Sequence, residues 1–281
     1  MNKLIIVGLA LLGTVACSDV EQDATVASAP VQQTDVTTDV TWDAVGEVFY
    51  NEFIPCTAGP DFSPESLDAM VAEWRAGGIA PDLLGAWGYA PASDQNQFPN
   101  GWWEVNWPSK AAADDVWAQW GEDDGAKAWA AKYENVMVCD VSGKYGWDFK
   151  FSRAPDSFGP MPESGQFASS FLPCSFNEGK GFDDLNVGIA AYESWLDGLD
   201  ADSSGFYAHG IYSARPETET DGVDFFWAHF HENMAAMQLG NESWEATGGG
   251  AKASLEATAT CTNPDIYNSK TFYDPTNPDF S

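Results

Sequence analysis

A regular apolar stripe predicts an amphipathic helix early in the chain. Its members recur at intervals of three and four residues, and they are Leu67, Met70, Val71 and Trp74. Ser63 can cap the start of this helix, and Pro64 suits its first turn. A matching stripe returns later in the chain, at Leu185, Ile189 and Tyr192. The pattern therefore predicts two similar helices far apart in the sequence.

Each helix lies within the same series of extended segments, which are rich in aromatic and β-branched residues. In the first half the predicted strands are 47–56, 83–90 and 101–107, a second helical region covers 111–132, and a last strand ends at Cys139. In the second half the strands are 166–174, 205–213 and 223–231, the helical region covers 233–247, and the last strand ends at Cys261. The glycines at 248–250 predict a flexible break.

Landmark residues recur at nearly constant separations, which indicates a duplication. Cys56 and Cys174 are 118 residues apart, and so are Leu67 and Leu185. Later pairs are 122 or 123 residues apart, namely Tyr89 with Tyr212, Trp107 with Phe230, Cys139 with Cys261 and Tyr145 with Tyr267.

The order of elements in each copy, βαββαβ, resembles the ferredoxin-like unit. The tandem pair resembles the dimeric α+β barrel superfamily, here fused into one chain as a pseudo-dimer, without indicating a specific family. The resemblance implies an α+β fold with one repeat over 46–155 and another over 156–281. In such a fold, the open faces of the two sheets bury each other.

The N-terminus reads as a secretory signal peptide over residues 1–16, with Lys3 before a short apolar stretch. The segment 14–17 ends in Cys17 and resembles a lipobox, although Thr14 stands where such motifs prefer Leu. This predicts lipidation at Cys17, with 17–45 as a disordered tether. Because Ser18 rather than Asp follows the cysteine, we expect an outer-membrane anchor facing the periplasm or the cell surface. The alternative is a plain signal peptide with an incidental cysteine.

Composition narrows the possible partners. The formal net charge is −31, which would repel the phosphate backbone of nucleic acid. Aromatic residues make up 14% of the chain and include 13 Trp, enough for a large core. We therefore expect no nucleic-acid partner, while the oligomeric state stays open.

Four cysteines remain after Cys17. In a ferredoxin-like sheet the first and last strands are neighbours, so the resemblance implies disulfides Cys56–Cys139 and Cys174–Cys261. An exported protein can keep such bonds oxidised. The alternatives are four buried thiols or a zinc site, but the cysteines lack the CxxC spacing typical of zinc sites.

The candidate chemistry lies in the second half, which holds all three histidines. His209, His229 and His231 fall on the second and third predicted strands of that half. His229 and His231 share a side with Phe225 and Trp227, and we expect that side to face the barrel interior. A hairpin around 218–219 would place His209 beside His229. We predict these three histidines as catalytic candidates.

The first half adds matching positions on its third strand. At a separation of 123 residues, Trp102, Glu104 and Asn106 align with Phe225, Trp227 and His229. An interior lined by aromatics with a few polar groups is typical of a small-molecule site. Five residues are the predicted ligand contacts: Trp102, Glu104, Asn106, Phe225 and Trp227.

Three functions stay open. The first is a pocket for a small, partly apolar molecule, with or without a reaction. The second is a metal-dependent enzyme that uses the three histidines. The third is a non-catalytic envelope module with a packed interior. No motif in the sequence identifies a reaction or a cofactor.

Overall fold

The computed structural model describes residues 45–77, 82–199 and 205–276, all within one compact unit, 39–281. The predicted signal peptide 1–16, Cys17 and the tether up to residue 44 lie outside the described residues. Among the helices of the described part, none combines the length and apolar character that a membrane crossing requires.

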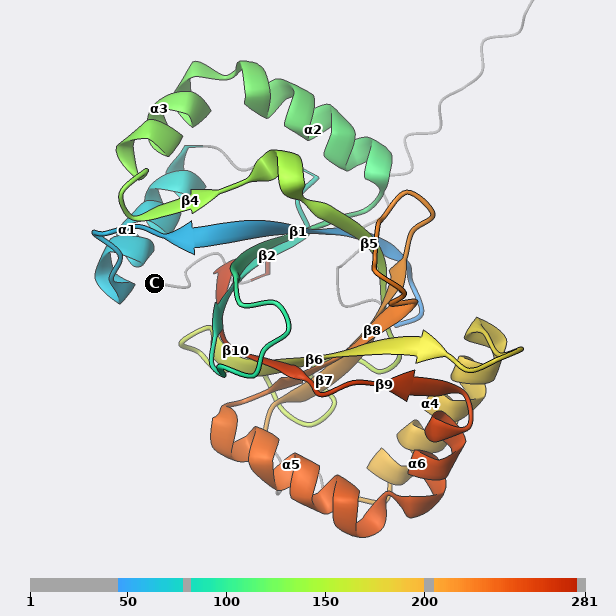
Figure 1. Cartoon of the computed structure of the whole chain (residues 1–281). Coiled ribbons are helices and arrows are strands. Elements are labelled where there is room, and N and C mark those ends of the chain that lie inside the picture. The colour runs from blue at the N-terminus through green and yellow to red at the C-terminus, as the bar shows by residue number, and fades with distance from the viewer. Residues whose placement is uncertain (1–44, 78–81, 200–204, 277–281) are drawn as a thin grey trace, which may run out of the picture. The chain divides into compact units, whose positions relative to one another are not determined.

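The two halves repeat one order of elements (Figure 1). The first half holds β1 (Phe49–Ala58), α1 (Pro64–Ala76), β2 (Gly85–Pro91), β3 (Gly101–Trp107), α2 (Lys110–Glu122), α3 (Asp124–Lys132), β4 (Met137–Cys139), the 3-10 turn η1 (Val141–Gly143) and β5 (Tyr145–Phe151). The second half holds β6 (Gln166–Phe176), α4 (Phe182–Leu196), β7 (Tyr207–Ala214), β8 (Phe225–His231), α5 (Met234–Thr247), α6 (Gly249–Glu256), β9 (Ala259–Cys261) and β10 (Asp265–Tyr273).

Local capping explains where the helices begin and end. The hydroxyl of Ser63 accepts a hydrogen bond from the backbone N–H of Ser66, as its position before Pro64 predicts. Asp123 ends α2 and caps α3, because its carboxylate accepts from the N–H of Ala126 at 2.6 Å. The flexible break predicted at 248–250 is wrong, since Gly248 joins α5 directly to α6.

Eight strands close into an antiparallel ring in the order β10-β2-β3-β1-β5-β7-β8-β6, with β6 pairing back to β10. The two halves meet at β5–β7 and at β10–β2. Strands end at Cys139 and Cys261, as predicted, but neither is the last strand of its half. The short β4 and β9 end there, but the chain continues into β5 and β10, which complete the ring.

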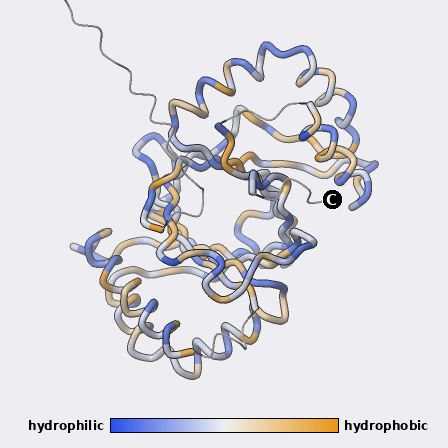
Figure 2. The backbone as a smooth tube through the Cα atoms, turned by 180° about the vertical axis from the view of Figure 1, so that it is seen from behind, coloured by the Kyte–Doolittle hydropathy of each residue, from blue (hydrophilic) through white to orange (hydrophobic). Residues whose placement is uncertain are grey.

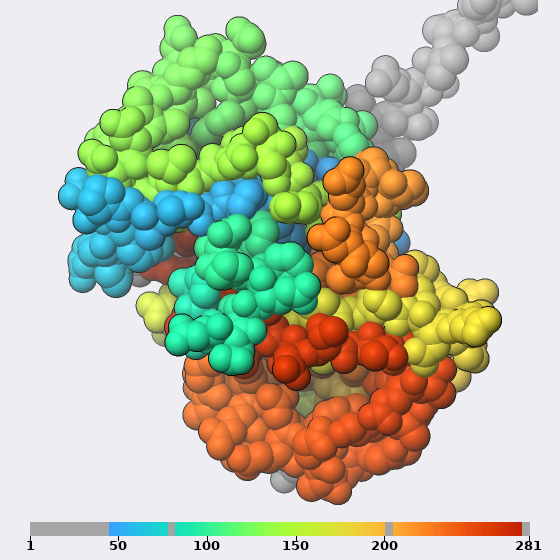
Figure 3. Space-filling view, in the orientation of Figure 1, coloured from blue at the N-terminus to red at the C-terminus, as the bar shows by residue number. Residues whose placement is uncertain are grey.

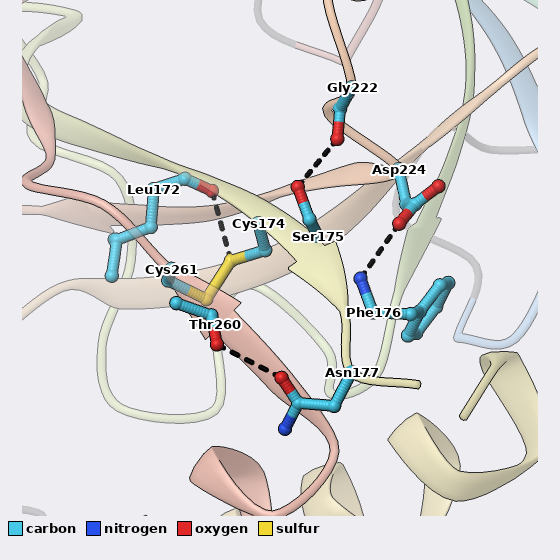
Figure 4. Close-up of a disulfide and its surroundings, with 9 residues drawn as sticks. All are labelled: Leu172, Cys174, Ser175, Phe176, Asn177, Gly222, Asp224, Thr260 and Cys261. Atoms are coloured by element: carbon cyan, nitrogen blue, oxygen red, sulfur yellow. Dashed lines mark hydrogen bonds between the residues drawn. A yellow bond between two sulfur atoms is a disulfide. The ribbon is translucent and has the colours of Figure 1, made fainter. Parts of the chain in front are cut away.

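A disulfide ties each short strand to the first strand of its half. Cys56 lies opposite Cys139 in the β1–β4 pair and bonds to it. Cys174 and Cys261 repeat this between β6 and β9 (Figure 4). Both predicted disulfides are thus confirmed, and the alternative of four thiols is wrong.

The ring separates an interior core from two outer cores. Aromatic side chains fill the interior, among them Phe49, Phe149, Phe171, Tyr212 and Phe230. A second core lies between the first half's strands and α1–α3, and a third between the second half's strands and α4–α6. Along these helices hydrophilic and hydrophobic residues alternate, as expected for helices with one covered face (Figure 2).

Candidate functional site

The register of β3 and β8 decides which side chains face the interior. Phe53 pairs with Glu104, and its counterpart Phe171 pairs with Ala228. Glu104 therefore matches Ala228, which lies 124 residues later rather than the predicted 123. A one-residue slip moves every side chain of a strand to the other face.

The predicted interior position of the histidine side of β8 is therefore wrong. Phe226, Ala228 and Phe230 join the interior core. Phe225 and Trp227 pack in the outer core against α4 and α6, and His229 and His231 line a cavity on that same outer face. In the first half the expectation is confirmed, because Trp102, Glu104 and Asn106 line cavities of the interior.

A buried carboxyl occupies the middle of the interior. Glu104 is fully buried, and it accepts hydrogen bonds from Asn51 Nδ2 at 2.6 Å, from the Tyr212 hydroxyl at 2.8 Å and from the Tyr89 hydroxyl. Burial raises the pKa of Glu104 to about 7, although the three donors oppose that shift. The cavity beside Glu104 and Asn106 has a volume of about 30 Å³, so the packing leaves room for a water rather than a substrate.

A much larger cavity lies outside the ring, between strands β6–β8 and helices α4–α6. We call it the interlayer cavity. Its volume is about 840 Å³, and its lining includes Tyr192, Trp195, Trp227, His229 and Trp244. Figure 3 shows a hollow of the surface framed by α5, α6 and the chain around β9, the elements that line this cavity. The candidate site is therefore in the second half, but outside the barrel.

His209 is beside His229, as predicted, because the two residues pair directly across β7 and β8. Its side chain is buried, and both ring nitrogens have partners. Trp227 Nε1 donates to His209 Nδ1 at 3.2 Å, and His209 Nε2 lies 2.5 Å from the carboxylate of Glu193. Since Nδ1 accepts, Nε2 carries the proton and donates to Glu193. This arrangement holds His209 in place and leaves neither nitrogen for a ligand.

Two further charged residues hold the His209 side chain in place. Glu193 lies on α4, and Arg153 lies in the segment after β5. Arg153 pairs with Glu193 and also with Asp197. Burial would raise the pKa of Glu193, but the hydrogen bonds from His209 and Arg153 outweigh it and hold that pKa below its ordinary value. Glu193 is therefore an ionised acceptor that fixes the His209 ring.

His229 is the histidine best placed to meet a ligand. It lines the interlayer cavity, and the described residues give only its Nδ1 a hydrogen-bond partner, the Tyr207 hydroxyl at 2.8 Å. Tyr207 in turn lies 2.5 Å from the Tyr192 hydroxyl, oxygen to oxygen. Burial, with the neighbouring His209 and His231, lowers the pKa of His229 well below its ordinary value. Its ring is therefore neutral near pH 7 and presents Nε2 as one hydrogen-bonding group.

His231 lines the same cavity beside α5, where a side chain at Gly240 would crowd its ring. Burial lowers the pKa of His231 to about 4. It too is neutral near pH 7.

The three imidazoles do not converge on one point. Their rings lie nearly parallel in a row, with 6.1 Å between the centroids of His209 and His229 and 6.5 Å between those of His229 and His231. A shared zinc ion would require a nitrogen of each ring at about 2.0–2.1 Å from the metal. Within the described ranges, no group of three or more His, Cys, Asp and Glu side chains could hold a metal ion.

Sequence reasoning missed the tyrosines of this site. The sequence pattern places Tyr192 in the apolar stripe of its helix, and Tyr207 lies on the strand two residues before His209. The alternation of Tyr207 with His209 was the available signal, because residues two apart share a face of a strand.

No family model and no curated protein matches the sequence. Among solved structures, an anthrone oxidase-like protein matches with a TM-score of 0.47 and 10% identity, covering 81% of this chain and 94% of that one. A mutant chlorite dismutase from Candidatus Nitrospira defluvii has a TM-score of 0.47 and 9% identity, covering 80% and 92%. A candidate monooxygenase from Lactobacillus acidophilus NCFM has a TM-score of 0.44 and 7% identity, covering 81% and 95%. These likenesses assign neither a family nor an activity.

Proposed function

We propose that the protein binds a small, largely apolar molecule in the interlayer cavity and that His229 forms the main polar contact to it. The observation that carries this proposal is the cavity of about 840 Å³ that His229 lines together with Trp227 and Trp244. Its volume lies in the range typical of small-molecule sites, about 300–1,000 Å³. Aromatic and aliphatic side chains form much of its wall, and charged side chains such as Glu232, Glu245 and Lys252 also line it.

The chemistry of His229 favours a neutral polar group on the ligand. The ring is uncharged near pH 7, so it gives no ion pair to a carboxylate or phosphate. Its Nε2 can exchange one hydrogen bond with a hydroxyl or carbonyl. The lowered pKa also makes His229 a weak base, which favours recognition over proton abstraction in the ligand-free protein.

The test compares 2-naphthol with naphthalene as probes by isothermal titration calorimetry. The two share an apolar body, and only 2-naphthol can bond to His229. We expect 2-naphthol to bind about 3- to 10-fold more tightly, the effect of one net hydrogen bond. In His229→Phe the imidazole becomes an apolar ring, so we expect naphthalene binding to persist and the preference for 2-naphthol to vanish.

Phe98→Leu is the matched control, because Phe98 lines a different cavity, in the barrel. This variant should bind both probes as the parent protein does. The proposal is wrong if neither probe binds, or if a folded His229→Phe protein, verified by circular dichroism, keeps the preference for 2-naphthol.

We also propose that the chain is an exported lipoprotein anchored through Cys17. The leader pattern of 1–16 supports this proposal, and so do the two disulfides, which persist in oxidising compartments. Expression in a Gram-negative host with an alkyne-labelled fatty acid should label the parent protein in the membrane fraction. Cys17→Ala should lose both the label and the membrane association, and an unlabelled parent protein would contradict the lipid anchor.

We infer further that the two halves arose as tandem ferredoxin-like repeats. The shared element order, the equivalent disulfides and the symmetric joins β5–β7 and β10–β2 support this history. The repeats have since diverged. The positions of β2 and β3 that are equivalent to the three histidines of β7 and β8 hold Ala86, Val105 and Trp107.

A further inference from the structure

We propose that the barrel holds a second binding site, which takes a small organic cation such as a methylated ammonium. This site is a cavity of about 210 Å³ at one end of the ring, and we call it the barrel-mouth cavity. It is distinct from the interlayer cavity. Phe226 lines the barrel-mouth cavity, whereas its neighbour Trp227 lines the interlayer cavity on the other face of β8.

Aromatic rings form most of the wall. They come from strands of both halves and from the β2–β3 connection, and they include Phe53, Phe98, Trp102, Tyr145, Trp147 and Phe226. Neighbouring rings meet edge to face, with interplanar angles of 73° for Trp102 and Tyr145 and 71° for Trp147 and Phe226. In such a pair the edge of one ring meets the face of the other, and every ring face carries the negative part of the ring quadrupole. A cation within about 6 Å of these faces would be attracted to them.

The charged residues of the lining all have one sign. Glu219 and Asp221 lie on the β7–β8 loop and Asp265 begins β10, while no Lys, Arg or His is found among the described residues that line this cavity. Glu219 and Asp221 are exposed and take part in none of the ion pairs of the described chain. Their charge is thus available to an incoming cation, whereas an anion would meet only repulsion.

Hydrogen bonds among lining residues hold part of the wall in place. Asp265 is buried, and its carboxylate accepts the backbone N–H groups of Gln97 at 2.5 Å and of Phe98 at 3.1 Å. Trp102 Nε1 donates to the Tyr267 hydroxyl at 3.2 Å, which itself donates to the carbonyl of Phe98 at 3.0 Å. The backbone of Phe98 and the ring of Trp102 are therefore positioned before any ligand arrives, which lowers the entropic cost of binding.

The experiment compares choline with 3,3-dimethylbutan-1-ol by isothermal titration calorimetry at low ionic strength. The two molecules have nearly the same shape, and only choline is charged. We expect choline to bind at least about 10-fold more tightly. Tyr145→Leu and Trp102→Leu should each weaken choline binding about 2- to 30-fold, while Trp102→Phe should keep part of it. Tyr145 is 42% exposed, so its replacement leaves the core intact.

A double variant tests the carboxylates. Glu219→Gln with Asp221→Asn removes two charges, and Asn tolerates the positive φ of 48° at position 221. We expect a loss of about 2- to 25-fold in affinity for choline and a weaker dependence on salt. Trp244→Leu, in the interlayer cavity, should leave choline binding unchanged. The proposal is overturned if choline does not bind, if the neutral alcohol binds as tightly, or if Tyr145→Leu and Trp102→Leu have no effect.

Discussion

Glu104 differs strongly in size and polarity from the residue at the equivalent position of the second half. It occupies the centre of the barrel, where the second half has Ala228. Four buried side chains, Asn51, Tyr89, Glu104 and Tyr212, form one hydrogen-bonded group there. The carboxyl has a pKa raised to about 7, so the folded protein holds its proton far more tightly than the unfolded chain, whose ordinary value is 4.5.

This shift makes stability depend on pH. The contribution of a group with a raised pKa is fully present below the unfolded value and is lost as pH rises through the folded value. We therefore expect Glu104 to lose about 3 kcal/mol of its contribution to the free energy of unfolding between pH 4.5 and pH 7.

Glu104→Gln keeps the size of the side chain and cannot ionise. Urea unfolding of both proteins at pH 5 and pH 8 should show the variant gaining about 3 kcal/mol relative to the parent protein at the higher pH. An equal difference between the two proteins at both pH values would contradict the assigned pKa.

At the scale of elements, the sequence predicts much of the framework, but the prediction lacks β5 and β10 and assigns the two faces of β8 wrongly. The strand 101–107, the helix after Ser63 and both disulfides follow from periodicity, capping and the resemblance. The faces of β8 do not follow, because aromatic residues occupy both sides of β3 and β8, at Trp102 and Trp103 and again at Phe226 and Trp227. A strand buried on both faces gives no alternation that fixes its phase.

The one-residue error in aligning β3 with β8 comes from the connection that precedes each of these strands. It covers 92–100 in the first half and 215–224 in the second, one residue more. Pairing Trp107 with Phe230 matched two aromatics but shifted the register. The interlayer cavity could not be predicted either. Its volume depends on the distance between the helices and the sheet, and sequence patterns do not give that distance.

The disulfides give a prediction at this same scale. Cys56 and Cys139 are 83 residues apart in the sequence, so their bond restricts the unfolded chain strongly. In the chain-entropy model, Cys56→Ser with Cys139→Ser should lower the free energy of unfolding by about 4.5 kcal/mol. Cys174→Ser with Cys261→Ser removes the other disulfide, which spans a similar 87 residues, and serves as the matched comparison. Chemical denaturation of both double variants checks this, and a loss below about 1 kcal/mol in either would contradict it.

Across the whole folded unit, the two halves share one order of elements but differ in how tightly the helices pack against the sheet. In the first half, the space between sheet and helices is packed with indoles, with ring centroids 5.0 Å apart for Trp74 and Trp103 and 6.1 Å apart for Trp103 and Trp129. In the second half the helices leave the interlayer cavity open. This contrast agrees with the binding role that we propose for the second outer core, while the first outer core is packed. The barrel between them belongs to both halves.

The closed ring also affects how readily the protein can associate with itself. Open sheet edges offer unpaired backbone groups to other chains and so promote intermolecular β-pairing. Each of the eight ring strands has a neighbour on both sides, since β5 pairs with β7 and β10 with β2. The strands of the described chain that present a free edge, β4 and β9, are three residues long and are covalently tied down. Closure of the eight strands into one ring thus leaves only short, disulfide-bonded edge strands in the described chain for intermolecular β-pairing.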